Sequence, residues 1–316
     1  MYKNHKVAVV VPAYNEETLI TPTLEGIPGF VDMIFVVDDA STDKTRAVIE
    51  ARQGQDPRVH LVPHEVNQGL GKSLIDGYGE SKSSDADVTV VMAGDNQMDP
   101  RDLPALLDKI IDGGFDYVKG NRLLHGNIES MPRYRFLGNS VLTILTKFAT
   151  GYYSLMDPQC GYTAIRNGAL KKIPIEKMTR RYAYNADILC MLNIGRFRVT
   201  DVEVRPVYGQ SESKIKLSRY IPTASALLIR LFFRRLWRRY VILDFHPLVL
   251  FYLFAFCNFF LLIIPFAIRF VWLYFTDIKT PHWTFVMLVF TILITFQSIL
   301  FAIWMDMDYN RQPPHA

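Results

Sequence analysis

Short runs of apolar, mostly β-branched residues recur along the first part of the chain and predict buried strands. The clearest runs are residues 7–11, 33–37, 59–62 and 88–92. Helices are predicted between and after them, at residues 16–26, 43–52, 71–81 and 103–111, with start signals at Asn15 or Glu16 and at 41–43. Continuous apolar runs of this length are typical of strands covered on both faces of a parallel sheet. The pattern therefore predicts a doubly wound α/β domain with a mostly parallel, Rossmann-like sheet, in which ligands bind at the carboxyl ends of the strands.

Two longer apolar runs near the end of the chain predict a membrane hairpin. Residues 248–268 and 284–304 are each 21 residues long and carry no charged side chain, which meets the roughly 20 residues that a spanning helix needs. Buried core helices are the alternative, but two uncharged runs so close together favour the membrane. Pro265 would kink the first helix late. Asn258 and Gln297 could hydrogen-bond across the pair or between protomers, which would allow a homo-oligomer.

The formal charge of +4 is unevenly distributed, and its distribution predicts orientation. Residues 205–239 hold nine lysines and arginines against the single acid Glu212, so this stretch is +8 and the remainder −4. Because cations gather on the cytoplasmic side of spanning helices, we expect an integral membrane protein with its large N-terminal domain in the cytoplasm, at the plasma membrane if the chain is prokaryotic. The basic excess then faces lipid phosphate, and nucleic acid is not expected as a partner.

The segment before the first span predicts a basic amphipathic helix. Its apolar residues recur at helical spacing; they are Ile229, Phe232, Phe233, Leu236, Trp237 and Tyr240. Five arginines between 230 and 239 occupy the other half of the helix. We expect this helix to lie in the membrane interface with its cations facing anionic headgroups. A charged face that packs on the globular domain is the alternative.

Polar and acidic motifs follow the predicted strands. They are 12–16 (PAYNE), 38–43 (DDASTD), 64–72 (HEVNQGLGK) and 93–97 (AGDNQ). Carboxylates at successive strand ends suit recognition of a nucleobase or ribose and binding of a divalent metal on a diphosphate. The turn between Gly69 and Gly71 lets backbone approach a ligand, with Lys72 opening the next helix beside it. A phosphate loop of the usual pattern is excluded because Val66 stands where it needs glycine. Asp43 alone is typical of a helix cap.

Together and in this order, the motifs resemble those of the family-2 glycosyltransferases with a GT-A fold. More narrowly, they resemble the polyprenyl-phosphate sugar synthases, the group of dolichyl-phosphate mannose synthase, from about residue 6 to residue 215. The resemblance implies a nucleotide-sugar donor, UDP- or GDP-linked, whose pocket is lined by Pro12, Tyr14 and Glu16. It also implies that Asp39 pairs with the base or ribose.

The resemblance further implies a metal site in the loop after the fourth strand. The family's D-x-D-x-Q motif aligns on 93–97, with Ala93 in place of its first aspartate. Asp95 and Gln97 remain as ligands for Mg²⁺ or Mn²⁺, and Asp95 also joins the donor pocket. Because Mg²⁺ keeps waters and takes phosphate oxygens, one carboxylate fewer is tolerable.

Later matches to the family concern the acceptor, a polyprenyl phosphate of the dolichyl or undecaprenyl kind. Gly120 to Arg122 resembles its G-x-R, Asp157 opens a D-x-x-C-G-Y, Arg133 lies near the following helix, and 208–214 resembles its R-x-x-G-x-S-K. Arg122, Arg133 and Lys214 would hold the acceptor phosphate, and Asp157 would position the sugar or act as an auxiliary base. The alternatives are surface ion pairs for the arginines and a turn residue for Asp157.

The expected organisation is a glycosyltransferase domain (1–215), a basic juxtamembrane region (216–245), the hairpin (246–305) and a short cytoplasmic tail (306–316). The expected activity is transfer of one sugar, with inversion, from a nucleotide-sugar to polyprenyl phosphate. A phosphate monoester is already largely ionised at neutral pH, so it can attack without a strong base. A processive polysaccharide synthase and a non-catalytic membrane scaffold that binds sugar nucleotides are the alternatives.

Overall fold

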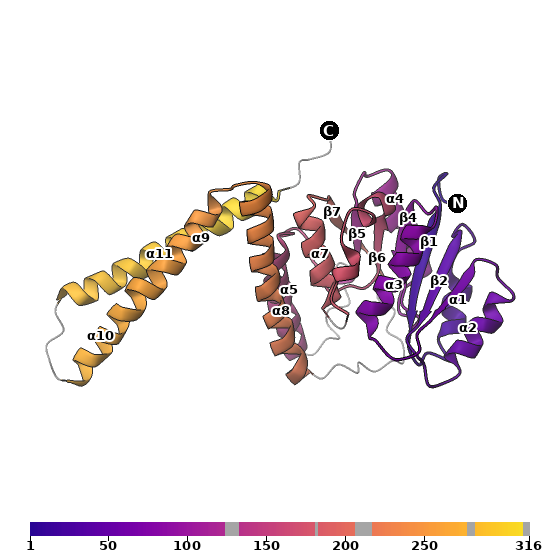
Figure 1. Cartoon of the computed structure of the whole chain (residues 1–316), viewed down its shortest axis with the longest axis horizontal. Coiled ribbons are helices and arrows are strands. Elements are labelled where there is room, and N and C mark those ends of the chain that lie inside the picture. The colour runs from indigo at the N-terminus through magenta and orange to yellow at the C-terminus, as the bar shows by residue number, and fades with distance from the viewer. Residues whose placement is uncertain (124–132, 181–182, 206–216, 277–281, 312–316) are drawn as a thin grey trace. The chain divides into compact units, whose positions relative to one another are not determined.

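The computed structural model describes residues 1–123, 133–180, 183–205, 217–276 and 282–311. The chain forms two compact units, Met1–Phe233 and Arg234–Ala316, each with its own architecture (Figure 1).

A seven-stranded sheet forms the centre of the first unit. Its strands are β1 (Val7–Ala13), β2 (Met33–Asp38), β3 (Val59–Pro63), β4 (Val88–Val91), β5 (Tyr117–Asn121), β6 (Thr163–Arg166) and β7 (Val199–Glu203). Their order is β3-β2-β1-β4-β6-β5-β7, and every neighbouring pair is parallel except the two that involve β6. The predicted mostly parallel α/β sheet is therefore confirmed. The carboxyl ends of β1, β2, β4 and β5 meet at one edge.

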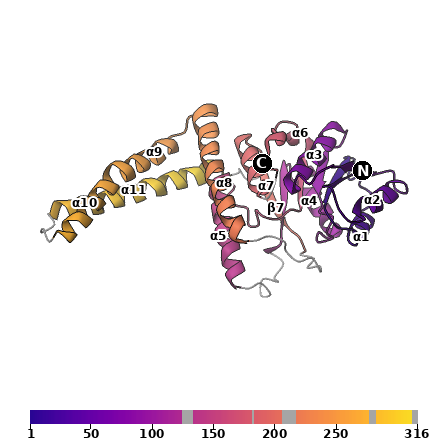
Figure 2. The same ribbon diagram turned by 60° about the horizontal axis from the view of Figure 1, so that its bottom comes forward.

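Helices cover both faces of this sheet (Figures 1 and 2). In chain order the helices are α1 (Ile20–Gly26), α2 (Thr45–Gln53), α3 (Leu70–Ser83), η1 (Pro100–Asp102), α4 (Leu103–Ile111), α5 (Arg133–Thr150), α6 (Asn167–Leu170), η4 (Ile175–Lys177) and α7 (Tyr184–Ile194). A further helix, α8 (Leu217–Trp237), packs through Leu228 and Leu231 on α5 and α7. Alternate residues of β1 enter two cores: Val9 packs with α1 and α4, and Val10 with α3 and α7. Burial on both faces explains why the strands are continuously apolar.

The first helix begins later than its sequence signals predict. Asn15 and Glu16 do not cap it, because α1 starts only at Ile20, after Leu19. Asn15 adopts a left-handed conformation (φ 56°), and its side-chain oxygen accepts the backbone N–H of Thr42 at 2.8 Å. The polar residues after β1 therefore join two loops at the carboxyl edge of the sheet.

Two long helical runs dominate the second unit. The first consists of α9 (Leu248–Asn258), the π-helical η6 (Phe259–Ile263) and α10 (Ile264–Phe275); the second is α11 (His282–Tyr309). Each run is 28 residues long, and only 17% and 22% of their most apolar windows are buried. Both are thus long and apolar enough to cross a membrane, and the core-helix alternative is disfavoured because most of their side chains face outward. Pro265 lies in the first turn of α10, just after the π-helical turn, where a missing N–H is tolerated.

The two polar residues of the spans have different settings. Asn258 is buried and donates to the hydroxyl of Thr295 at 2.8 Å and to the carbonyl of Thr291 at 3.3 Å. It therefore bonds across the pair, which is one of the two predicted possibilities. Gln297 lies on the exposed side of α11.

The arginines before the hairpin do not all face outward as predicted. Arg235 is fully buried and makes a two-pronged ion pair with the buried Asp306 of α11, with N–O distances of 2.8 and 2.7 Å. The hydroxyl of Tyr240 donates to the same carboxylate, and Asn310 donates to it at 2.8 Å. The prediction that all five arginines face headgroups is wrong for Arg235, because the helix pattern could not reveal an acid 71 residues further on. It is also wrong for Arg239, which is only 7% exposed and lies over the rings of Tyr240 and Tyr309.

Candidate functional site

The loops after β1 and β2 are hydrogen-bonded to each other at the carboxyl edge of the sheet. The backbone N–H of Asn15 donates to the hydroxyl of Ser41 at 3.0 Å, and that of Glu16 to the hydroxyl of Thr45 at 2.8 Å. Tyr14, the residue before Asn15, is 40% exposed. Pro12 is buried in β1, and its carbonyl accepts the N–H of Gly94 at 3.0 Å. Of the predicted pocket residues, Tyr14 thus offers an open ring, whereas Pro12 supports the loops behind it.

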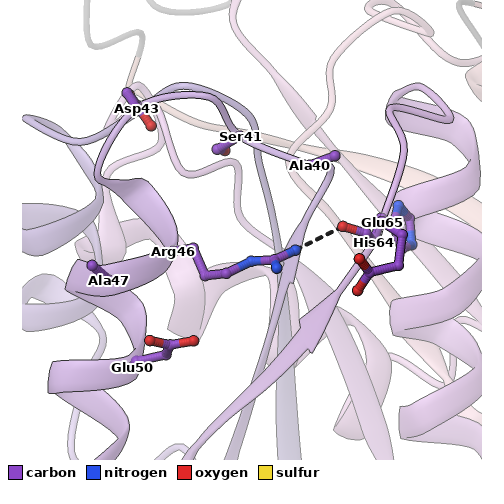
Figure 3. A pocket seen from close by; sticks show the side chains of 8 residues that line it. All are labelled: Ala40, Ser41, Asp43, Arg46, Ala47, Glu50, His64 and Glu65. Atoms are coloured by element: carbon purple, nitrogen blue, oxygen red, sulfur yellow. Dashed lines mark hydrogen bonds between the residues drawn. The ribbon is translucent and has the colours of Figure 1, made fainter.

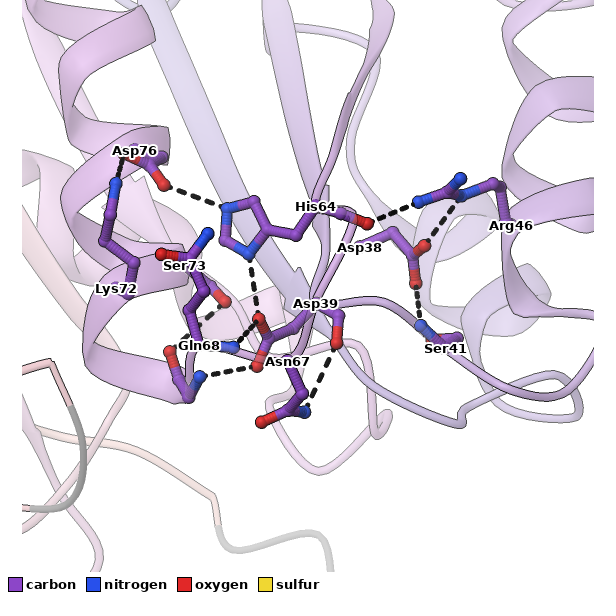
Figure 4. Close-up of polar contacts among 11 residues, drawn as sticks. Asp38, Asp39, Ser41, Arg46, His64, Asn67, Gln68, Lys72, Ser73 and Asp76 are labelled. Atoms are coloured by element: carbon purple, nitrogen blue, oxygen red, sulfur yellow. Dashed lines mark hydrogen bonds and ion pairs between the residues drawn. The ribbon is translucent and has the colours of Figure 1, made fainter.

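The two aspartates that end β2 are buried and engaged within the protein (Figure 4). Asp38 accepts from the guanidinium of Arg46 at 3.0 Å. Asp39 accepts the N–H groups of Gln68 and Gly69, both at 2.8 Å, and faces Nδ1 of His64 at 2.8 Å. Asp39 is only 3% exposed, and its hydrogen bonds hold the 68–69 turn. Its pairing with a base or ribose, implied by the resemblance, stays a prediction.

Gly71 and Lys72 also make contacts that the sequence did not reveal. A Cβ on Gly71 would lie 2.1 Å from the carbonyl oxygen of Thr179 and 2.7 Å from the carbonyl carbon of Arg180. A contact within the protein thus already requires glycine at this position, and the predicted approach of a ligand to this turn stays a prediction. Lys72 pairs with Asp76 one turn along α3, and Asp76 in turn faces Nε2 of His64 at 2.9 Å. His64 therefore lies between two carboxylates and joins β3 to α3.

Asp95 and Gln97 lie together in the loop after β4. The N–H of Gln97 donates to the Asp95 carboxylate at 3.2 Å, and the intervening Asn96 is left-handed with φ 56°. Burial raises the pKa of Asp95, and a nearby cation would offset that cost because it favours the charged form.

The donor atoms at this loop fit a hard divalent metal. A carboxylate and an amide oxygen are the donors that Mg²⁺ and Mn²⁺ accept. Across the described ranges, no group of three or more His, Cys, Asp or Glu side chains could hold a metal alone. An ion at Asp95 and Gln97 would therefore take its other ligands from water and from the phosphates of a donor, in keeping with the alanine at position 93.

Arg122 and Asp157 meet at the carboxyl end of β5. Nε and Nη2 of Arg122 donate to the two carboxylate oxygens at 2.8 and 3.2 Å. Asp157 is buried, whereas the Arg122 side chain is 48% exposed. The acid thus fixes the plane of a guanidinium whose surface is accessible. Arg133 begins α5, and Lys214 lies outside the described residues together with the whole 208–214 segment.

The loop that carries Asp157 adjoins the loop that carries Asp95. The hydroxyl of Tyr162 donates to the carbonyl of Asp99 at 3.2 Å. A Cβ on Gly161 would lie 3.2 Å from the methyl carbon of Met98. The candidate metal loop and the candidate phosphate-binding arginine therefore belong to one region of the sheet edge, as the order of motifs in the sequence predicts.

Sequence reasoning missed Lys119, a fully buried lysine on β5. Its ammonium donates to the carbonyl of Cys160 at 2.6 Å and to Oδ1 of Asn185 at 2.8 Å. The one available signal was a charged residue inside an otherwise uncharged strand segment, YVKGN. Its partners come from residues 41 and 66 positions further along, so no local pattern could name them.

A cavity of about 420 Å³ lies among the loop after β2, helix α2 and the residues after β3 (Figure 3). It is lined by Ala40, Ser41, Asp43, Arg46, Ala47, Glu50, His64 and Glu65. None of the residues predicted to bind the nucleotide lines it. Three carboxylates disfavour a phosphate there, and Arg46 is already paired with Asp38. Asp43 accepts the N–H of Thr45 at 2.9 Å. The N-cap residue of α2 is Lys44, so Asp43 lies one position before the cap that the sequence predicts.

The chain is similar to known sugar transferases over most of its first unit. Residues 8–174 match the family described as glycosyl transferase family 2. The UDP-N-acetylglucosamine–dolichyl-phosphate N-acetylglucosaminyltransferase of Methanococcus voltae is 27% identical over 65% of this chain and 86% of its own length. The undecaprenyl-phosphate mannosyltransferase of Micrococcus luteus is 29% identical over 58% of this chain and 76% of its own length.

A solved structure supports the fold. Glucosyl-3-phosphoglycerate synthase from Mycobacterium tuberculosis, crystallised with Mn²⁺, UDP-glucose and phosphoglyceric acid, superposes with a TM-score of 0.55. The two are 20% identical, and the match covers 73% of this chain and 80% of that one. At that identity the likeness concerns the fold, which is GT-A. With the family match over more than half of its length, the chain belongs to glycosyl transferase family 2 and is a glycosyltransferase.

Proposed function

We propose that this glycosyltransferase moves one sugar from a nucleotide-sugar to a polyprenyl phosphate on the cytoplasmic side of a membrane, with inversion at the anomeric carbon. The curated relatives named above carry out transfers to dolichyl or undecaprenyl phosphate. The observation that carries the proposal is the Arg122–Asp157 pair beside the Asp95 loop. It offers an oriented guanidinium for a phosphate next to a loop suited to a metal and a diphosphate.

The chemistry follows from these groups. Arg122 donates to the acceptor phosphate, and its planar guanidinium matches the phosphate oxygens. Asp157 orients Arg122 through two hydrogen bonds, and its burial makes this role better supported than that of an auxiliary base. Asp95 and Gln97 would hold Mg²⁺ or Mn²⁺, which as a Lewis acid offsets charge on the departing diphosphate. A phosphate dianion attacks in one displacement without an enzyme nucleophile, and this implies inversion.

The two apolar helical runs suit the proposed acceptor. They are long and apolar enough to anchor the enzyme in the bilayer that holds a polyprenyl chain. The cytoplasmic location of the catalytic unit remains part of the proposal and is based on the cations of residues 216–239. Gln297 is exposed and therefore accessible to a second protomer, so the proposal includes a homo-oligomer.

A donor panel tests this function. Purified full-length enzyme in detergent is incubated with Mg²⁺, undecaprenyl or dolichyl phosphate, and radiolabelled UDP- or GDP-sugars, and label in the organic phase is counted. We expect one nucleotide-sugar to label the lipid. Release of nucleotide without lipid labelling, or labelling of another acceptor, would contradict the proposal. Failure of every donor to be cleaved would favour the scaffold alternative.

The metal assignment has a separate test in Asp95→Asn. Loss of the charged ligand should reduce metal-dependent transfer by about a hundredfold or more, because little other protein charge is available to hold the ion. Asp112→Asn, at an exposed surface acid, is the matched control. Transfer rates are measured across a Mg²⁺ titration, and an Asp95→Asn enzyme with wild-type rates and Mg²⁺ dependence would exclude Asp95 as a ligand.

A further inference from the structure

The buried ammonium of Lys119 supports the loop that carries Asp157. Lys119 is three residues before Arg122 in the chain and is 0% exposed. It donates to the carbonyl of Cys160, and its other partner, Asn185, donates to the carbonyl of Gln159 at 3.2 Å. Lys119 and Asn185 therefore donate hydrogen bonds to two consecutive carbonyls of the 157–162 loop.

These hydrogen bonds do not require Lys119 to be charged. A neutral amine still has two N–H donors, enough for the Cys160 carbonyl and the Asn185 amide oxygen. Among the described residues, Lys119 makes no salt bridge, and its observed partners are both uncharged. A buried ammonium held only by neutral groups is costly. Deprotonation of Lys119 would therefore change the local charge without removing the support of the loop.

The ionisable groups around Lys119 come from several elements. Asp157 and Cys160 belong to the loop, Arg122 follows β5 and Asp201 lies on β7; Asp157, Arg122 and Asp201 are the charged members of this group. Asp157 also accepts a hydrogen bond from Arg122, and Asp201 accepts one from the side chain of Asn121 at 3.0 Å. Burial lowers the pKa of Lys119 to about 8, whereas burial raises the pKa of the Cys160 thiol, so the thiol stays neutral there.

We propose that Lys119 is a positioning residue for the acceptor phosphate, whose buried positive charge becomes stabilised when a phosphate dianion binds at Arg122. The inference rests on the proposed function, because it takes Arg122 as the phosphate site. Attraction between unit charges is stronger in the protein interior than in water. Phosphate binding therefore favours the protonated lysine, and the protonated lysine favours phosphate binding by the same factor.

This linkage predicts the pH dependence of phosphate affinity. With a pKa of about 8 in the free enzyme, about nine molecules in ten are protonated at pH 7 and about one in ten at pH 9. If the protonated form is the binding form, affinity falls about tenfold over that interval. The phosphate itself stays a dianion throughout, since its second pKa is near 6.

Binding of farnesyl phosphate, a short polyprenyl phosphate, tests this without a sugar donor. Full-length enzyme in detergent is titrated calorimetrically at about pH 7 and about pH 9. The wild type and the control Lys109→Met, which changes an exposed lysine of α4, should lose about tenfold in affinity. Lys119→Met, which carries no charge at either pH, should bind at pH 7 at least about tenfold more weakly than the wild type and show no further loss at pH 9. Asn185→Asp places a carboxylate against the ammonium, so it should keep its affinity up to pH 9.

Four outcomes would overturn the inference. Lys119→Met could show the tenfold loss of the wild type, or it could bind at pH 7 as tightly as the wild type. If Lys119→Met does not fold, Asn185→Asp decides alone, and a wild-type loss of affinity in that variant contradicts the role of Lys119. If the wild type binds no farnesyl phosphate at either pH, the acceptor site itself is wrong, and the proposed function fails with the inference. If the variants bind farnesyl phosphate with the same pH dependence as the wild type, the inference fails and the proposed function stands.

Discussion

At the scale of single residues, the site depends on how carboxylates are already paired. Asp39, Asp76 and Asp157 each accept hydrogen bonds inside the protein, and each thereby fixes another group: the 68–69 turn, His64 or Arg122. Asp95 accepts one backbone N–H and carries a raised pKa because of burial. The acids are therefore not equivalent, and Asp95 is the one with the most to gain from a cation.

Arg122→Lys tests the importance of the oriented guanidinium. Lysine keeps the charge but cannot make the two-pronged bond to Asp157, so the phosphate donor loses its fixed direction. We expect transfer, measured as kcat/KM for polyprenyl phosphate, to fall by about ten- to a hundredfold.

The matched control for this variant is Arg58→Lys. Arg58 forms a comparable two-pronged pair with Asp56, away from the carboxyl edge. It should retain wild-type transfer. Equal losses in the two variants would show that disrupting any two-pronged arginine–aspartate pair lowers transfer, and that Arg122 has no special role at the phosphate.

Side-chain roles were harder to predict from sequence than the positions of the motifs. The order of the strand-end motifs placed Asp39 and Asp95 at one edge of the sheet, because parallel strands end on the same side. Asp157 precedes the antiparallel strand β6, a direction that the sequence pattern did not predict. Whether an acid there faces a ligand depends on partners from distant segments. The N–H groups of Gln68 and Gly69 bond to Asp39, and Cys160 and Asn185 are the hydrogen-bond partners of Lys119.

At the scale of secondary-structure elements, α3 shows how a glycine can be explained by packing. The turn before α3 has Gly69 at φ 91°, which glycine tolerates well. Gly71 instead provides space for the backbone of residues 179–180, and the N–H of Lys72 donates to the carbonyl of Arg180 at 2.9 Å. A glycine near a strand end looked like a ligand contact because sequence does not reveal which backbone lies against it.

Gly71→Ala and Gly79→Ala form a matched pair on this helix. The first would place Cβ 2.1 Å from a carbonyl oxygen, whereas the second meets nothing within 4 Å. We expect Gly71→Ala to lower the free energy of unfolding by about 1–3 kcal/mol or more. Gly79→Ala should raise it by up to about 1 kcal/mol, since alanine favours the helix. Denaturant unfolding of the full chain measures both, and equal effects would contradict the packing of residues 179–180 against α3.

The ion pair between Arg235 and Asp306 is the corresponding feature of the second unit. Both side chains are 0% exposed, so removing one leaves a buried charge without its partner. Asp306→Ala should destabilise the second unit by about 3–5 kcal/mol. Asp308→Ala, an exposed acid on the same helix, should have little effect. Thermal unfolding in detergent compares the two, and a neutral Asp306→Ala would show that the pair contributes no stability.

At the scale of the whole molecule, the chain forms two compact units that meet at Phe233 and Arg234, within the predicted juxtamembrane region. The sheet of the first unit and the two apolar helical runs of the second follow from patterns that are local and strong. The predicted spans of 21 residues are the uncharged parts of helical runs of 28 residues; the first span begins with its run, at Leu248. The sequence could not show that the second helix continues to a buried acid, since Asp306 looks like the start of a polar tail.

The most direct test of the central claim is the mass of the lipid product. Full-length enzyme is given polyprenyl phosphate, Mg²⁺ and the nucleotide-sugar that labels the organic phase, and the extracted lipid is analysed by mass spectrometry. We predict a single new species, heavier than polyprenyl phosphate by one sugar residue and absent with Arg122→Lys at matched short times. A ladder of products with increasing sugar number, or a sugar joined through a diphosphate, would contradict the proposed transfer of one sugar to polyprenyl phosphate.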